Sequence, residues 1–307
     1  MGLKLTSRRA VVRGMLATGW IGAAGVSAVG CSPAPPPTIP PPDPSDHEAL
    51  LAWSVLGPLR LEPERDEFRH PMESLTFWGL RPGATVLELM PGRGWWSAIL
   101  APYLSVSGGR LIVASLAEGL DSEAGRAVDA AFDAHMAENP TAAAIITRAA
   151  LTSDDAPITE PASVDLVVIA RNMHTLMAAG LAELALRKVL ACLKPGGALG
   201  IEQHRASSSG VQDPLAQTGY VQEAYVRSLA EAAGFSFVGS TDVNANPRDT
   251  RDHPFGVWSL PPVLRTAPLG ESPNPNFDTS PYRTIGESDR MTLKFIRPLA
   301  ETAVTTP

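Results

Sequence analysis

ATVLELMPGRGWWSAIL, from Ala84 to Leu100, predicts a buried strand, a glycine turn and the start of a helix in immediate succession. Val86, Leu87 and Leu89 suit a buried parallel strand, and a helical pattern begins at Trp95. This order of elements is typical of doubly wound sheets, in which ligands bind beyond the carboxyl ends of the strands.

The turn between strand and helix predicts a ligand site. Glu88 falls where the strand ends, and Pro91, Gly92 and Gly94 follow it in the turn. Glycines permit a tight turn and a close approach of a ligand to the backbone. The same spacing also marks ordinary strand-to-helix connections, so the turn alone leaves both readings open.

Further strands and helices alternate along the chain. Buried strands are predicted at Gly108–Ser115, Val164–Ala170 and Ala198–Gln203, and a helix at Ala182–Leu193 ends at LKPGG. Proline and glycine there stop the helix and turn the chain into the next strand. Such alternation implies a parallel sheet with right-handed crossovers.

The C-terminal part predicts architecture more than chemistry. A helix is expected within Gly219–Gly234, followed by strands at Phe235–Ser240 and Met291–Ile296. The proline-rich passage Pro254–Pro281 is too long for a simple hairpin and is expected to form a flap or an extension over one face. The acids and arginine in Gly286–Arg290 are expected to form a surface ion pair.

Longer segments around these elements resemble a known family. They are RDEFRHPMESLTFWGLRPG, ARNMHTL, EQHRA, GVWSLPP and IGESDRMTLKF, in this order. With the glycine turn and LKPGG, they make the chain from Arg65 to Pro298 resemble class I S-adenosylmethionine-dependent methyltransferases, and among these a subgroup of exported bacterial predicted methyltransferases. The resemblance implies a Rossmann-like α/β fold, with a seven-stranded mixed sheet between helices on both faces and an antiparallel last strand beside the fifth.

The resemblance also implies S-adenosyl-L-methionine as cofactor. The residues it places at this cofactor are Glu88, Pro91, Gly92, Gly94, Ser115 and Arg171. Two positions depart from the family pattern. Met90 stands where the first glycine of the turn is usual, and Ser115 stands near the place of the acid that bonds the ribose, with Glu118 as a late substitute.

Catalytic candidates follow two predicted strands. Asn172 and His174 come after the fourth strand, where the resemblance places residues near the transferable methyl group, and His204 comes after the fifth. A histidine suits a general base, because its pKa lies near neutrality. The plainer alternative is that these side chains make structural hydrogen bonds and fix their loops.

The N-terminus predicts export. Twin arginines in Thr6–Arg13 and the uncharged stretch Met15–Val29 are typical of a Tat signal peptide over residues 1–30. AVGC, ending at Cys31, resembles a lipobox, so a lipid on Cys31 would tether the protein outside the inner membrane; an ordinary cleaved signal is the alternative. A proline-rich linker over 31–46 then leads to a domain over 47–307.

Composition and charge limit the partners. The chain carries a formal charge of −7, and without its first 30 residues, which hold four basic and no acidic residues, 21 basic and 32 acidic residues leave a charge of −11. Nucleic acid is therefore not expected as a partner. Asp249, Asp252 and His253 have ligand chemistry for a divalent metal, but such spacing is common in solvated loops, and no metal is predicted. Cys192 is expected to be a buried core residue.

The leading hypothesis is therefore a methyltransferase acting on an unidentified small molecule, in the periplasm or otherwise beyond the cytoplasm. The alternative is an exported, membrane-tethered, non-catalytic ligand-binding protein that retains the fold. It is motivated by the departures at Met90 and Ser115 and by the predicted export. An exported hydrolase ranks last, because the chain has no GxSxG nucleophile elbow.

Overall fold

The computed structural model describes residues 39–299 of the 307-residue chain. The predicted signal peptide and lipobox, and the linker up to residue 38, lie outside the described residues. All described helices and strands belong to one unit that begins at Pro41. Within residues 39–299, no helix has both the length and the apolar character needed to cross a membrane.

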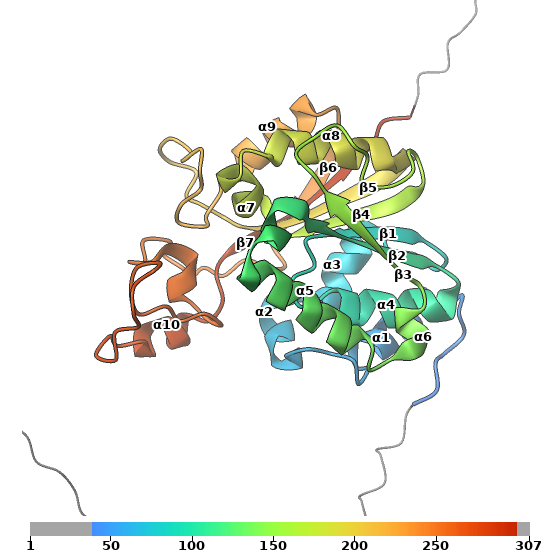
Figure 1. Cartoon of the computed structure of the whole chain (residues 1–307), viewed down its shortest axis with the longest axis horizontal. Helices are drawn as coiled ribbons and strands as arrows, with labels where there is room; N and C mark the ends of the chain where they lie inside the picture. The colour runs from blue at the N-terminus through green and yellow to red at the C-terminus, as the bar shows by residue number, and fades with distance from the viewer. Residues whose placement is uncertain (1–38, 300–307) are drawn as a thin grey trace, which may run out of the picture. The chain divides into compact units, whose positions relative to one another are not determined.

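A seven-stranded sheet forms the centre of this unit, in the order β3-β2-β1-β4-β5-β7-β6 (Figure 1). The strands are β1 (Thr85–Leu89), β2 (Arg110–Leu116), β3 (Ile146–Leu151), β4 (Val164–Ala170), β5 (Leu193–His204), β6 (Ser236–Thr241) and β7 (Arg290–Ile296). Neighbours pair in parallel except β7, which runs antiparallel to both β5 and β6. The predicted mixed sheet with an antiparallel last strand is confirmed.

Helices cover both faces of the sheet. One face packs against α1 (His47–Val55), α3 (Pro71–Trp78), α4 (Ser97–Ser107), α5 (Glu123–Met136) and α6 (Pro140–Ala143). The other packs against α7 (Met173–Ala178), α8 (Ala182–Cys192) and α9 (Glu223–Ala232). The shorter elements are η1 (Pro63–Arg65), α2 (Asp66–Arg69), η2 (Ala117–Asp121), η3 (Gly256–Ser259) and α10 (Ser280–Ile285). Helices on two faces of a doubly wound sheet make the fold Rossmann-like.

A close contact fixes α3 against the sheet. A Cβ placed on Gly200 of β5 would lie 2.4 Å from the Trp78 ring, so only glycine admits this tryptophan. The Trp78 indole N–H also donates to the Leu293 carbonyl of β7, at 3.1 Å. This packing holds the chain just before α3 at the carboxyl edge of the sheet.

Two element boundaries differ from the predictions by more than two residues. β5 begins at Leu193, in the predicted LKPGG turn, because Leu193 pairs with Val164 and the Gly196 N–H donates to the Arg297 carbonyl at 2.8 Å. α9 begins at Glu223, because the Val221 N–H donates to the carbonyl of His204 and keeps that stretch extended.

The predicted surface ion pair before β7 is wrong. Glu287, Asp289 and Arg290 are each at most 2% exposed. Because β7 lies between β5 and β6, the residues that lead into it lie at the carboxyl end of β5. There Glu287 contacts Arg65, and Arg290 contacts Glu202. Cys192, at 1% exposed, is a buried core residue as predicted.

Candidate functional site

A cavity of about 570 Å³ lies at the carboxyl ends of β1, β4 and β5. It is bounded by the segment before α3, the turn after β1, the loop after β4, η3 with the residues that follow it, and the entry to β7. Of the nine predicted site residues, seven line it: Glu88, Pro91, Gly92, Arg171, Asn172, His174 and His204. The sheet therefore brings the residues that follow three separate strands into one place.

The other two predicted residues, Gly94 and Ser115, do not line this cavity. A Cβ on Gly94 would lie 3.0 Å from the Phe132 ring, so this glycine allows α5 to pack closely. The Ser115 hydroxyl donates to Asp129 at 2.8 Å, and Glu118 accepts from the Ser153 N–H at 3.0 Å. The end of β2 is thus bound to α5 and to the loop after β3.

The turn after β1 is held open toward the cavity. Met90 and Gly92 both have positive φ, 55° and 59°, and a Cβ on Gly92 would meet nothing within 4 Å. The Asn172 amide donates to the Met90 carbonyl at 2.9 Å and, more weakly, to Leu89 at 3.4 Å. Asn172, just after β4, therefore supports the backbone of the turn that follows the neighbouring strand β1.

Glu88 is a buried carboxyl at the mouth of the sheet. It is 3% exposed and accepts a hydrogen bond from the Ser97 hydroxyl at the start of α4. Burial raises its pKa to about 7, although Ser97 and the nearby Arg171 act in the opposite direction. Near neutral pH, a cation placed beside it would favour the ionised form.

Two histidines line the opposite wall, with ring centroids 5.5 Å apart. Burial lowers the pKa of His174, and burial lowers that of His204 well below its ordinary value, so both rings are neutral near pH 7. The Gln203 amide contacts His174 Nδ1, and Ser288 contacts His204 Nδ1 at 2.5 Å. Among the described residues, His174 Nε2 has no hydrogen-bond partner, and it can accept a proton in the tautomer whose Nδ1–H donates to Gln203 Oε1, at 3.4 Å.

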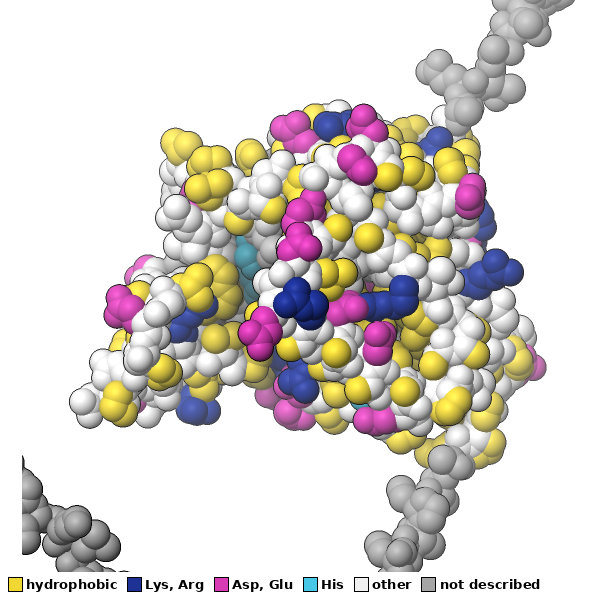
Figure 2. Space-filling view, in the orientation of Figure 1, with side chains coloured by type: hydrophobic (Ala, Val, Ile, Leu, Met, Phe, Trp, Pro, Cys, Tyr) yellow, Lys and Arg dark blue, Asp and Glu magenta, His cyan; other side chains and the backbone are white. Residues whose placement is uncertain are grey.

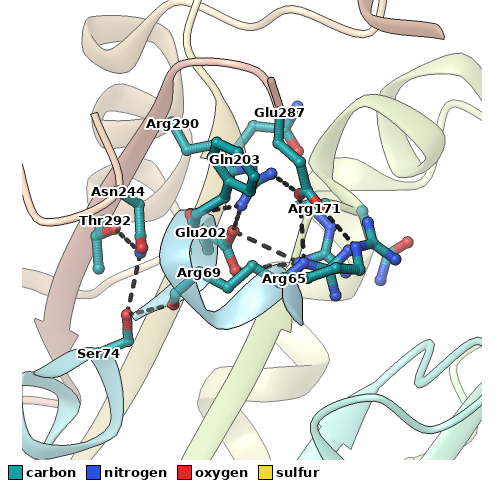
Figure 3. Close-up of polar contacts among 12 residues, drawn as sticks. Arg65, Arg69, Ser74, Arg171, Glu202, Gln203, Asn244, Glu287, Arg290 and Thr292 are labelled. Carbon is teal, nitrogen blue, oxygen red and sulfur yellow. Dashed lines mark hydrogen bonds and ion pairs between the residues drawn. The ribbon is translucent and has the colours of Figure 1, made fainter. Parts of the chain in front are cut away.

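Four arginines, Arg65, Arg69, Arg171 and Arg290, form a cluster at the cavity wall (Figure 3). Arg290 donates to Glu202 at 3.0 Å and to Glu287, and Arg171 lies 3.3 Å from Glu202.

Glu287, just before β7, connects this strand to the segment before α3. It accepts from Arg65, from Arg69 at 3.3 Å and from Arg290. Burial alone would raise the pKa of Glu287, but these three arginines outweigh burial and hold the pKa well below its usual range. Glu287 is therefore a fixed negative charge.

The predicted flap supplies another wall. Val257 and Trp258 of η3 and Pro261, Pro262 and Val263 after it line the cavity. The Trp258 ring lies 5.9 Å from the ring of His174. The Arg265 guanidinium stacks on the Trp258 ring, 4.8 Å from the ring centroid. Figure 2 shows a histidine at the bottom of a hollow beside the part of the molecule that carries α10.

Asp249 is buried, although Pro247, Arg248, Thr250 and Asp252 of the same loop are exposed. Asp249 is 2% exposed and accepts from Tyr220 at 3.0 Å, from the Arg251 and Asp289 N–H groups, and contacts His253 at 2.8 Å. Within the described part of the chain, no three histidine, cysteine or acidic side chains gather as metal ligands do. Asp249 instead fastens its loop to the entry of β7.

Sequence reasoning did not assign Arg65, Glu287, Ser288, Arg290 or Trp258 to the site. All five line the cavity. Their segments carried the family resemblance, but nothing local in those segments indicates that residues some 220 positions apart are in contact, as Arg65 and Glu287 are.

No protein-family model and no curated protein matches the chain. Solved structures with a similar fold include the [4+2]-cyclase SpnF, at 14% identity and a TM-score of 0.49, covering 76% of this chain and 81% of that one. A SAM-dependent methyltransferase from Aquifex aeolicus matches at 23% identity and a TM-score of 0.44, over 60% and 88%. Geranyl diphosphate C-methyltransferase from Streptomyces coelicolor A3(2) matches at 14% and 0.48, over 80% and 87%. At these identities the likeness concerns the fold alone, which is the Rossmann-like mixed sheet described above.

Proposed function

We propose that the protein is an S-adenosylmethionine-dependent methyltransferase acting on a small molecule. One observation carries the proposal: Glu88, the open turn at Gly92 and the free nitrogen of His174 line one cavity at the carboxyl edge of the sheet. Of the segments that resemble class I methyltransferases, the glycine turn, ARNMHTL, EQHRA, GVWSLPP and IGESDRMTLKF contribute residues to this cavity, whereas LKPGG lies at the start of β5, at the opposite edge of the sheet.

The residues present fit the amino-acid and sulfonium end of the cofactor. Glu88 supplies a carboxylate for a cationic group, and the bare backbone at Gly92 leaves space for close approach. Asn172 keeps the turn in place through the Met90 carbonyl. The adenosine end finds less support, because Ser115 donates to Asp129 and does not line the cavity.

When bound, the cofactor supplies an electrophilic methyl group on its sulfonium sulfur. His174 Nε2 takes a proton from the acceptor as the acceptor attacks, and Gln203 Oε1 accepts from the Nδ1–H and holds the ring. Trp258 and the residues after it cover the cavity and limit access of water. Together these groups orient the acceptor toward the methyl group, where positioning contributes much of the rate.

Calorimetric titration of the full chain with S-adenosylmethionine and S-adenosylhomocysteine tests the proposal. We expect binding that Glu88→Ala weakens at least about tenfold, since a buried ionic contact is removed. Glu73→Ala, at an exposed position of α3, is the control and leaves the affinity unchanged. Absence of binding to folded protein for both compounds at about 1 mM contradicts the proposal.

Turnover separates the enzyme from the alternative, a binding protein with the same fold. Incubation with a small-molecule extract and labelled S-adenosylmethionine should yield labelled product that His174→Ala reduces. Binding of both cofactor forms without any labelled product in such extracts favours the non-catalytic alternative.

Export and lipid attachment remain part of the proposal. They rest on the twin arginines and on the lipobox-like residues before Cys31. Labelling cells with a radioactive fatty acid should mark the wild-type protein, and Cys31→Ser should remove the label. Recovery of unlabelled wild-type protein from the cytoplasm contradicts this part.

A further inference from the structure

The arginine cluster leaves hydrogen-bond donors unused at the cavity wall. Arg69, 2% exposed, uses only Nε, toward Glu287 at 3.3 Å, and its face stacks on Trp95 at 4.5 Å. Arg171 uses Nη1 alone, toward Glu202. Among the described residues, Arg69 Nη1 and Nη2 and Arg171 Nε and Nη2 have no hydrogen-bond partner, although both side chains line the cavity.

The charges here do not balance. Four clustered arginines face two buried carboxylates, Glu202 and Glu287. Glu62 pairs with Arg65 from a half-exposed position, and Glu88 is only partly ionised near neutral pH. A buried guanidinium without a matching anion is costly, and a chain with a net charge of −7 does not acquire such a cluster through general basicity.

Arg171 lies on the acceptor side of the cavity. It directly precedes Asn172 and stands three residues before His174, in the loop after β4. Its φ of 57° is fixed by its N–H, which donates to the Glu202 carbonyl at 2.6 Å. The fold therefore holds the arginine beside the proposed base.

We propose that the methyl acceptor is an anion, a small carboxylate or phosphate ester, whose charged group is held by Arg171 and Arg69. This rests on the proposed function. Guanidinium groups suit both chemistries, because their planar N–H pairs match the oxygens of carboxylates and phosphates. An anion there supplies the missing counter-charge and leaves the rest of the molecule near His174.

Thermal unfolding of the full chain in phosphate, succinate and chloride at equal ionic strength tests the anion site. At about 50 mM anion and a dissociation constant of a few millimolar, we expect the melting temperature to rise by about 2 to 4 °C over chloride. Phosphate also stabilises proteins generally, so the readout is the difference between wild type and Arg171→Gln, in which the specific rise is lost.

Arg205→Gln is the matched control, because Arg205 has 21% side-chain exposure against 20% for Arg171, and it lies outside this cavity. Arg205→Gln should keep the anion-dependent rise in melting temperature seen in wild type. If Arg171→Gln does not fold, Arg171→Lys serves instead. It should lose most of the anion-dependent rise in melting temperature, since lysine lacks the paired N–H donors of a guanidinium. An equal rise in wild type and in the Arg171 variant, or no rise in wild type, overturns the proposal.

Titration with S-adenosylhomocysteine, which carries its own carboxylate, identifies the source of the anion. An acceptor site predicts that phosphate and S-adenosylhomocysteine bind together, and that Arg171→Gln keeps the affinity for S-adenosylhomocysteine. Competition between them, with equal weakening of both by Arg171→Gln, assigns the arginines to the cofactor and overturns the proposal. Phosphate binding without any S-adenosylhomocysteine binding supports the anion site and contradicts the proposed methyltransferase.

Discussion

Glu88→Gln should remove a pH-dependent penalty on folding. Burial raises the pKa of Glu88 to about 7 in the folded protein, from an ordinary value of 4.5 that applies in the unfolded chain. Between these values the folded protein holds a proton that the unfolded chain has released. The unfolded state therefore binds fewer protons in this window, and the free energy of unfolding falls as the pH rises.

The size of this effect follows from the two pKa values. Their difference corresponds to about 3.4 kcal/mol in total, at about 1.36 kcal/mol for each pKa unit. Between about pH 5 and about pH 8, about 2.5 kcal/mol of this is lost. Glutamine cannot ionise, and its side-chain oxygen still accepts from the Ser97 hydroxyl.

Urea unfolding at both pH values measures this difference. From about pH 5 to about pH 8, wild type should lose about 2.5 kcal/mol more free energy of unfolding than Glu88→Gln does. Glu73→Gln, at an exposed helical position, should follow wild type. If wild type and Glu88→Gln change in parallel, within about 0.5 kcal/mol, Glu88 does not titrate near 7 and the reasoning from burial is refuted.

Two further predictions concern packing and the Asp249 loop. Gly200→Ala should lower the free energy of unfolding, measured by chemical denaturation, by about 1 to 3 kcal/mol, because the added Cβ would lie 2.4 Å from the Trp78 ring. Gly239→Ala in β6, whose Cβ would meet nothing within 4 Å, is the control and should be nearly neutral. Asp249→Asn should lower the free energy of unfolding by about 2 to 4 kcal/mol, since four groups contact this buried carboxylate. Asp252→Asn, at an exposed position of the same loop, should leave it nearly unchanged, and equal effects of the two changes would refute the role assigned to Asp249.

Local hydrophobic patterns predicted the parallel strands, because each of them buries a continuous apolar run, and the family resemblance added the antiparallel last strand. Val86, Leu87 and Leu89 are each at most 1% exposed, as the pattern indicated. Once the strands are known, side chains just after them must meet at one edge of the sheet. The family resemblance indicated Asn172 and His174 at this edge, and both line one cavity with Gly92 of the glycine turn.

The remaining part of the site depends on packing between distant segments. Glu287 and Arg290 stand in a polar run whose composition is typical of a surface, and only the insertion of β7 buries them. Arg65 meets Glu287 because Trp78 holds α3 against β5 and β7. Ser115 contacts Asp129 because of the way α5 is oriented about its own axis, and a short sequence pattern does not specify that orientation.

The position of β7 has a consequence for the order in which the site is completed during synthesis. β6 joins the sheet only through β7, and β7 brings Glu287 with it. While the ribosome is still making residue 286, the edge of β5 is unpaired and Arg69 lacks its carboxylate partner. An unpaired edge strand is prone to wrong associations, and before β7 enters the sheet the cavity also lacks the wall that Glu287, Ser288 and Arg290 supply. The free edge of β5 and this wall of the cavity are therefore closed together, by the entry of the last strand.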